Sequence, residues 1–188
     1  MKYLYLTMFI LFSIGALAQE NEKLPYYEIP DASESFTAGT VAARLVDGLG
    51  FRYYHASEGL TENDLKFSPS EGARTSLETI EHIYGLSKII VNSCLQKQNS
   101  RDEEDLGYDD LRAKTLMNLK TAADILRSSD DISQFKLLFG ENEVPFWNNI
   151  NGPIADAIWH SGQLATMRRM SGNLINSKIS HFNGTVRQ

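Results

Sequence analysis

The chain contains a single cysteine, Cys94, among its 188 residues. An internal disulfide needs two thiols, so no cross-link within the chain can stabilise the fold, and the hydrophobic core must do so. Cys94 follows the apolar run 89–91, which indicates a small packed residue near a helix end rather than a nucleophile. We therefore expect neither a disulfide nor thiol-based catalysis.

A basic surface is also lacking. Asp and Glu number 24 against 18 Lys and Arg, which gives a formal net charge of -6 at pH 7. Binding to a nucleic-acid backbone needs a cluster of positive side chains, so we expect no nucleic acid among the partners. The one dense charge run, residues 101–105, is predicted to be a solvated loop. The sequence also contains no glycine-rich phosphate loop and no Ser–His–Asp or Cys–His arrangement.

Long apolar runs are confined to the N-terminus. Lys2 is followed by an almost wholly apolar stretch, residues 3–17, and then by the polar stretch 19–23. About fifteen apolar residues are short for a membrane span, and small residues precede Gln19 where a signal peptidase would cleave. We predict a signal peptide at 1–18 and a secreted or periplasmic protein with no membrane span after cleavage. An uncleaved anchor is the alternative.

Residues 19–34 are polar and contain Pro25 and Pro30, which favours an extended N-terminal arm. The aromatic pair Tyr26 and Tyr27 is expected to hold this arm against the body of the protein.

Helical periodicity dominates the rest of the chain, and no stretch alternates long enough to build a sheet. We predict helices over about residues 35–57, 70–98, 109–128 and 151–171. The predicted buried positions are Val41, Leu45, Leu49, Tyr53 and Ala56 in the first helix; Leu77, Ile80, Tyr84, Ser87 and Val91 in the second; and Leu111, Thr115, Leu119, Ala122 and Leu126 in the third. The expected fold is an all-α four-helix bundle over 35–188 that ends in an extended tail, residues 173–188.

Glycine and proline interrupt two of these helices. Gly48 and Gly50 weaken the first helix, although a glycine inside a bundle often permits close approach of a neighbour. Proline is tolerated in the first turn of a helix but not in its interior, so Pro153 places the start of the last helix near Asn151. We expect Asn149 or Asn151 to cap that helix.

The residues that could carry chemistry centre on the last helix. Asp156 lies four positions before His160, and residues i and i+4 lie one turn apart on the same helix face. His82 falls at the border of the apolar face of the second helix. By spacing alone the Asp–His pair is a weak signal, because an ordinary hydrogen-bonded pair on a helix surface has the same spacing. His55 could be buried or exposed, and His181 is expected at the surface.

Three segments together resemble the DinB-like (DinB/YfiT-type) family, including a secreted, Bacteroidetes-type branch of it. They are Arg44–Leu49, Glu78–Leu86 and Trp159–Leu164, and the likeness extends from about Phe36 to the C-terminus. The resemblance implies a four-helix bundle with up-down-down-up connectivity, which we expect the link between Ser128 and Pro145 to accommodate.

The resemblance also implies a metal site. The family usually holds its metal with three histidines, one in the second helix and two spaced four apart in the last. His82 and His160 match two of them, whereas Asp156 replaces the third and Ser161 replaces a common arginine. Two imidazoles and one carboxylate still leave open positions on a divalent ion, and Zn, Ni, Fe and Mn are all compatible.

Gln163 and Glu78 lie close in sequence to the predicted ligands, three residues after His160 and four before His82. We predict that they orient a ligand or a metal-bound group, with ordinary exposed polar residues as the alternative.

The resemblance leaves three functions open. The first is an exported metal-dependent enzyme, a hydrolase or a transferase of unknown substrate. The second is a non-catalytic protein that binds a metal or a small ligand, with a homodimer as an open alternative to a monomer, and the third is a structural bundle without metal.

Overall fold

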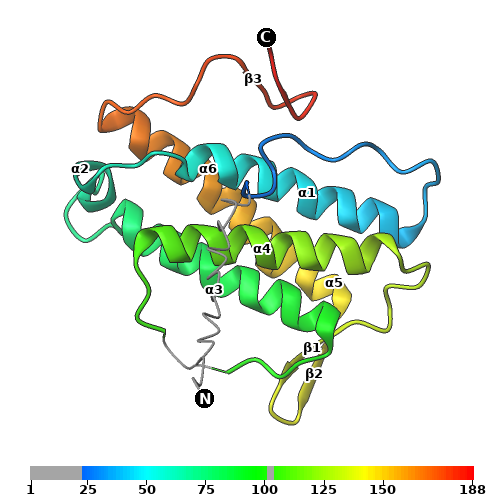
Figure 1. Ribbon diagram of the computed structural model, residues 1–188. Helices are drawn as coiled ribbons and strands as arrows, with labels where there is room; N and C mark the ends of the chain where they lie inside the picture. The colour runs from blue at the N-terminus through cyan, green and yellow to red at the C-terminus, as the bar shows by residue number, and fades with distance from the viewer. Residues whose placement is uncertain (1–22, 101–103) are drawn as a thin grey trace, which may run out of the picture.

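The computed structural model describes residues 23–100 and 104–188. The predicted signal peptide and the first residues of the predicted arm lie outside this part. Four long helices are present: α1 (Ala38–Ser57), α3 (Ser76–Leu95), α4 (Tyr108–Arg127) and α6 (Ala155–Met170). Figure 1 shows that α1 and α6 run in one direction and α3 and α4 in the other. The predicted all-α, up-down-down-up bundle is confirmed. None of the described helices is long and apolar enough to span a membrane.

The connection between the parallel helices α3 and α4 is the crossover of the bundle. Because both helices run the same way, Leu95 at the end of α3 and Tyr108 at the start of α4 lie at opposite ends of the bundle (Figure 1). The prediction that the link after Ser128 accommodates this topology is wrong. That link instead holds a short hairpin, β1 (Lys136–Phe139) paired with β2 (Asn142–Pro145). Of the charge run 101–105, the two described residues are exposed, as predicted.

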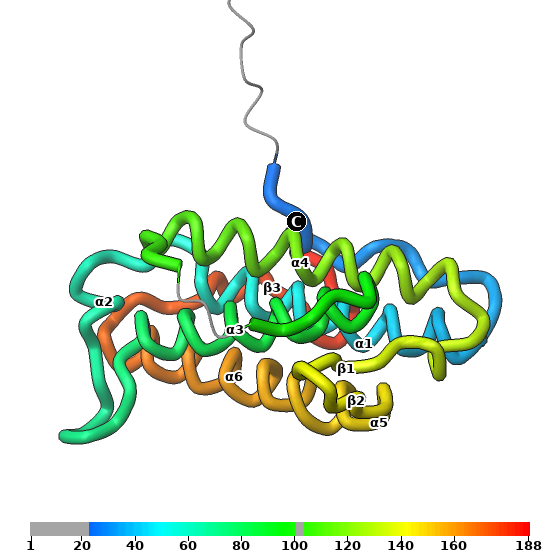
Figure 2. The backbone as a smooth tube through the Cα atoms, turned by 90° about the horizontal axis from the view of Figure 1, so that it is seen from below, coloured from blue at the N-terminus to red at the C-terminus, as the bar shows by residue number. Residues whose placement is uncertain are grey.

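The second helix begins at Ser76 and not at the predicted Ser70. Thr75 caps it, and the Glu78 carboxylate accepts hydrogen bonds from the Thr75 backbone N–H at 2.7 Å and hydroxyl at 3.1 Å. Such a reciprocal capping box satisfies two donors that a helix start would otherwise leave unpaired. The residues before Thr75 therefore form a loop after the short helix α2 (Glu62–Lys66). This loop and α2 lie at one end of the bundle, with the hairpin and α5 (Phe146–Asn149) at the other (Figure 2).

The core contains all the predicted positions of α4 and most of those of α3. Cys94 is buried as well, and burial raises the pKa of its thiol to about 12, which fits a packed residue. Helix α1 differs from the prediction, because Val41 is 56% exposed and Leu45 is 38% exposed. This helix packs against both α4 and α6, and small residues such as Ala42 and Ala43 fill the contact.

Two glycines of α1 lie where any side chain would clash with a neighbouring segment, which explains their place inside a closely packed helix. A Cβ on Gly39 would lie 1.8 Å from the carbonyl oxygen of Ser129, and a Cβ on Gly50 would lie 2.4 Å from the ring of Tyr26. Gly50 thus seats the buried Tyr26, and the predicted anchoring of the arm is confirmed at this residue. Gly48 differs, because a Cβ there would meet only the Arg52 guanidinium, at 3.3 Å.

The C-terminal tail is more structured than expected. Strands β3 (Ile179–Ser180) and β4 (Thr185–Val186) form a small hairpin that lies on the arm. The backbone N–H of Ile29 donates to the Gly184 carbonyl at 2.8 Å. The arm is held from beneath by buried His55, whose Nε2 lies 3.0 Å from the Tyr27 carbonyl oxygen. Burial lowers the pKa of His55 below its ordinary value of 6.5.

A second polar contact joins α2 to the end of α6. The buried Asp64 carboxylate accepts hydrogen bonds from the Ser171 hydroxyl at 2.5 Å, the Asn173 amide at 2.8 Å and the Thr61 backbone N–H at 2.8 Å. Burial alone would raise the pKa of Asp64, but these hydrogen bonds outweigh it and hold the pKa below its ordinary value. This network fixes α2 to the residues that directly follow α6.

Candidate metal centre

The helix that carries Asp156 and His160 is preceded by an irregular helical segment. Helix α5 continues into η1 (Ile150–Ile154), a π-helical turn, and then into α6. Pro153 cannot donate a backbone hydrogen bond, and Gly152 absorbs the distortion with a non-helical φ of -98° and ψ of -106°. Asn149 has helical dihedral angles and no side-chain capping bond, so its predicted capping role is wrong. Regular α-helix from Ala155 then places Asp156 and His160 one turn apart.

The structure brings His82, Asp156 and His160 together between α3 and α6. The Nε2 atom of His82 lies 3.2 Å from Asp156 Oδ2, and the Nε2 atom of His160 lies 3.4 Å from Asp156 Oδ1. The two imidazole rings are nearly perpendicular, with centroids 4.6 Å apart. One ligand atom from each residue lies within 4.8 Å of the others. The predicted cluster therefore exists and could hold a metal ion.

The spacing and the donor set both fit a divalent ion. Ligand atoms about 2.0–2.2 Å from a shared ion lie within about 4 Å of one another, which small rotations of these side chains would reach. The side chains of His82, Asp156 and His160 are 31%, 39% and 14% exposed. An ion bound there would have protein on one side and an open approach on the other.

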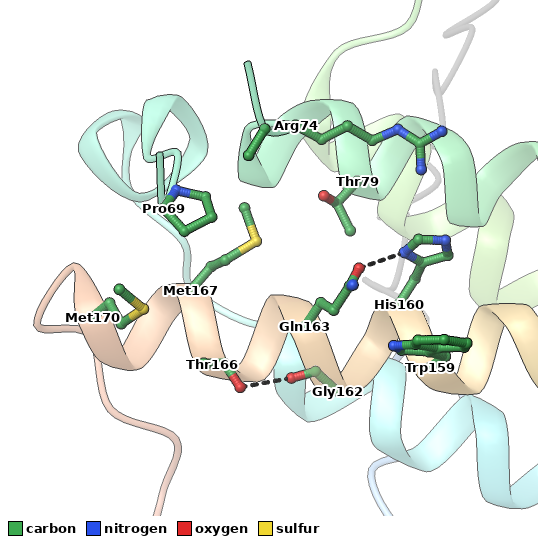
Figure 3. Close-up of a pocket in the computed structure, with 11 residues that line it drawn as sticks. Pro69, Arg74, Thr79, Trp159, His160, Gly162, Gln163, Thr166, Met167 and Met170 are labelled. Atoms are coloured by element: carbon green, nitrogen blue, oxygen red, sulfur yellow. Dashed lines mark hydrogen bonds between the residues drawn. The ribbon is translucent and has the colours of Figure 1, made fainter. Parts of the chain in front are cut away.

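Gln163 contacts one of these three residues. Its Oε1 atom lies 2.6 Å from His160 Nδ1 (Figure 3), so in the tautomer that protonates Nδ1 this nitrogen donates a hydrogen bond to the amide oxygen. In the neutral imidazole the other nitrogen, Nε2, then presents a lone pair toward Asp156. A lone pair and a carboxylate oxygen that face each other at 3.4 Å repel unless a positive charge lies between them.

Glu78 is placed differently. Its carboxylate oxygen is bonded to the Thr75 backbone and hydroxyl, and these bonds lower its pKa. The residue thus caps the helix that carries His82, and its contacts with Thr75 account for the carboxylate without a role at the metal.

A pocket of about 560 Å³ adjoins His160 on the α2 side of the cluster (Figure 3). It is lined by the loop after α2, the first turns of α3 and the exposed face of α6. The lining side chains that sequence reasoning missed are Pro69, Arg74, Trp159, Met167 and Met170. Trp159 was visible only as the neighbour of His160, and Arg74 was assigned to a helix that begins after it.

Comparison with known proteins supports the fold and leaves the chemistry open. No family model matches the chain, and no curated protein matches it. The structure is similar to the crystal structure of a DinB-like protein, YjoA, from Bacillus subtilis, with a TM-score of 0.51 and 16% sequence identity. The match covers 76% of this chain and 99% of that one. At this identity the likeness shows that the chain has the DinB-like fold, and the secreted branch stays a prediction.

Proposed function

We propose that this chain, with its DinB-like fold, is an exported protein that binds a divalent metal ion through His82, Asp156 and His160. The observation that carries the proposal is the convergence of one ligand atom from each of these three residues within 4.8 Å of the others. With His160 Nδ1 bonded to Gln163 Oε1, His160 Nε2 faces Asp156 Oδ1 at 3.4 Å, and a shared cation would bind both atoms.

The donor set suggests which ions are suitable. Two imidazole nitrogens and one carboxylate oxygen suit Zn, Ni, Fe(II) or Mn, and the carboxylate shifts preference toward harder ions than three imidazoles would. When bound, such an ion would act as a Lewis acid and lower the pKa of a group in its open position. The pocket beside His160 would admit a small substrate, so the reaction class we propose is metal-dependent hydrolysis or group transfer.

The contacts of Asp156 also favour a second function. If His160 carries a proton on both nitrogens, its Nε2–H can donate to Asp156 and no metal is needed. In that case the cluster is a structural ion pair, and the protein is a non-catalytic ligand-binding or structural bundle. A homodimer stays a prediction under either function.

Metal analysis of protein purified without a His-tag separates the two functions. We expect about one equivalent of metal per chain in the wild type and a loss in the His82→Ala/His160→Ala variant. A His55→Gln variant is the matched control, because it replaces a histidine outside the cluster. If the wild type and the double variant hold the same small amount of metal, the metal site is wrong and the ion pair is favoured.

Export is tested separately. Cell fractionation should recover the protein outside the cytoplasm, with a mature N-terminus near Gln19. A product that begins at Met1 and stays in the cytoplasm would contradict export and leave the metal site untouched.

A further inference from the structure

The pocket beside His160 differs in charge from the protein that contains it. The chain is acidic, with 24 Asp and Glu. Among the residues described, however, no carboxylate lines this pocket, and the one permanently charged side chain that does is Arg74. A pocket without acids in an acidic protein favours an anionic ligand, because nothing in its wall repels one.

The hydrogen-bond donors of the Arg74 guanidinium are available to a ligand. Within the part of the chain that the structure describes, its guanidinium forms no hydrogen bond or ion pair. Two hydrogen bonds from Thr75 occupy the Glu78 carboxylate and lower its pKa, and the charge of Arg74 adds a smaller effect in the same direction. In Figure 3 the Arg74 side chain extends over Thr79, on the same side of the pocket as His160. A guanidinium in this position can form a two-pronged contact with a carboxylate or a phosphate.

The opposite wall is apolar and adaptable. Trp159 is 70% exposed and Met170 is 57% exposed, whereas Met167 is buried beneath them. Pro69 faces these side chains across the pocket (Figure 3). Exposed large apolar groups that gather in one place mark a binding surface, and thioether side chains can adjust to the shape of a ligand.

We propose that this pocket binds an organic monoanion with an apolar chain, whose acidic group pairs with Arg74 and whose apolar part lies against Trp159 and Met167. A volume of about 560 Å³ suits a ligand of this kind. The inference rests on the proposed function for its placement, because the ligand would reach the metal at His160. A divalent ion held by Asp156 keeps a net positive charge, so both ends of the pocket would attract an anion.

Calorimetric titration of the full chain tests the ligand class with three probes of equal length: octanoate, octanamide and octylammonium. We expect octanoate to bind about 10-fold more tightly than octanamide, since a hydrogen bond to a charged group is worth that much, and octylammonium not to bind. Arg74→Gln should remove most of the preference for octanoate over octanamide, and the part that a bound metal ion contributes should remain. Trp159→Ala should weaken octanoate and octanamide alike.

Matched controls separate the pocket from unspecific binding. Arg169→Gln and Trp147→Ala replace an exposed arginine and an exposed tryptophan outside this pocket and should leave both affinities unchanged. Equal binding of octanoate and octanamide, or an Arg74→Gln variant that binds octanoate as the wild type does, would overturn the inference. So would a Trp147→Ala variant that loses as much as Trp159→Ala.

Metal content, measured on the same samples, keeps this inference distinct from the proposed function. Arg74→Gln should retain the metal of the wild type. A wild type that prefers octanoate but holds no metal would support the anion pocket and overturn the metal site. A wild type that holds metal but does not prefer octanoate would overturn the anion pocket alone.

Discussion

Replacement of Gln163 by alanine should weaken metal binding although Gln163 is not itself a ligand. Its Oε1 atom lies 2.6 Å from His160 Nδ1, and a hydrogen bond donated by Nδ1–H to this oxygen would keep Nε2 free to bind the ion. Without this acceptor, His160 can place its proton on Nε2, and that proton must leave before the metal binds.

The size of the effect follows from the exposure of this bond. Loss of a hydrogen bond to a metal-bound histidine costs 10- to 100-fold in affinity. Gln163 is exposed, so water can partly replace it, and the effect should lie near the lower limit. We expect the dissociation constant to rise about 10-fold, or about 1.4 kcal/mol. Gln163→Glu should tighten binding relative to the wild type, because a carboxylate is a stronger acceptor.

Competition against a chromophoric chelator measures these constants for Zn²⁺. Thr166→Ala, an exposed change one turn further along α6, is the control and should bind as the wild type does. The reasoning fails if Gln163→Ala binds Zn²⁺ as tightly as the wild type, or if Gln163→Glu and Gln163→Ala weaken binding equally.

Three further predictions concern stability and are measured by urea unfolding. Asp64→Asn should cost about 1–3 kcal/mol, because the amide offers one acceptor oxygen to donors that now share two; an unchanged midpoint would contradict this. The neutral form of His55 is favoured in the folded state, so stability should be full above about pH 6.5 and fall as the pH drops toward the lowered pKa. His55→Gln keeps a donor without titrating, and an equally steep loss in that variant would implicate other groups. Gly39→Ala should cost about 1–3 kcal/mol by overpacking, whereas Gly48→Ala should be neutral or gain up to about 1 kcal/mol. Similar effects at Gly39 and Gly48 would contradict the contacts described.

Periodicity predicted the helices well where one face is buried and poorly where packing is two-sided. The stripe of α4 from Leu111 to Leu126 is buried as predicted, because this helix has one continuous apolar face. In α1 the same reasoning buried Val41 and Leu45, although Ala42 and Ala43 make the contact. Where two helices pack closely, small side chains face the neighbour. A pattern based on hydrophobicity alone does not distinguish small apolar residues from large ones.

Local backbone chemistry explains the remaining differences in the fold. The helix starts after the capping box of Thr75 and Glu78 and not at Ser70. The sequence contains the signal for this start, a threonine three residues before a glutamate. The π-helical turn before α6 was not readable, because Pro153 predicts a helix start, whereas in the structure the chain continues from α5 through η1 with Gly152 distorted and Ile154 buried.

At the candidate site, the spacing of Asp156 and His160 predicted that they share a helix face. The family resemblance was needed to add His82, which comes from a different helix. Gln163 Oε1 lies 2.6 Å from His160 Nδ1, and its orienting role stays a prediction. Arg74 and Met170 could not be found, since neither the pocket nor the exposure of its walls is encoded in local sequence.

Crystals of protein purified without a His-tag and loaded with Zn²⁺ test the central claim most directly, through an anomalous difference map at the zinc edge. We predict one strong peak about 2.0–2.2 Å from His82 Nε2, His160 Nε2 and an Asp156 oxygen, with Gln163 still on His160 Nδ1. A map without a peak there, in which His160 donates directly to Asp156, would contradict the metal centre.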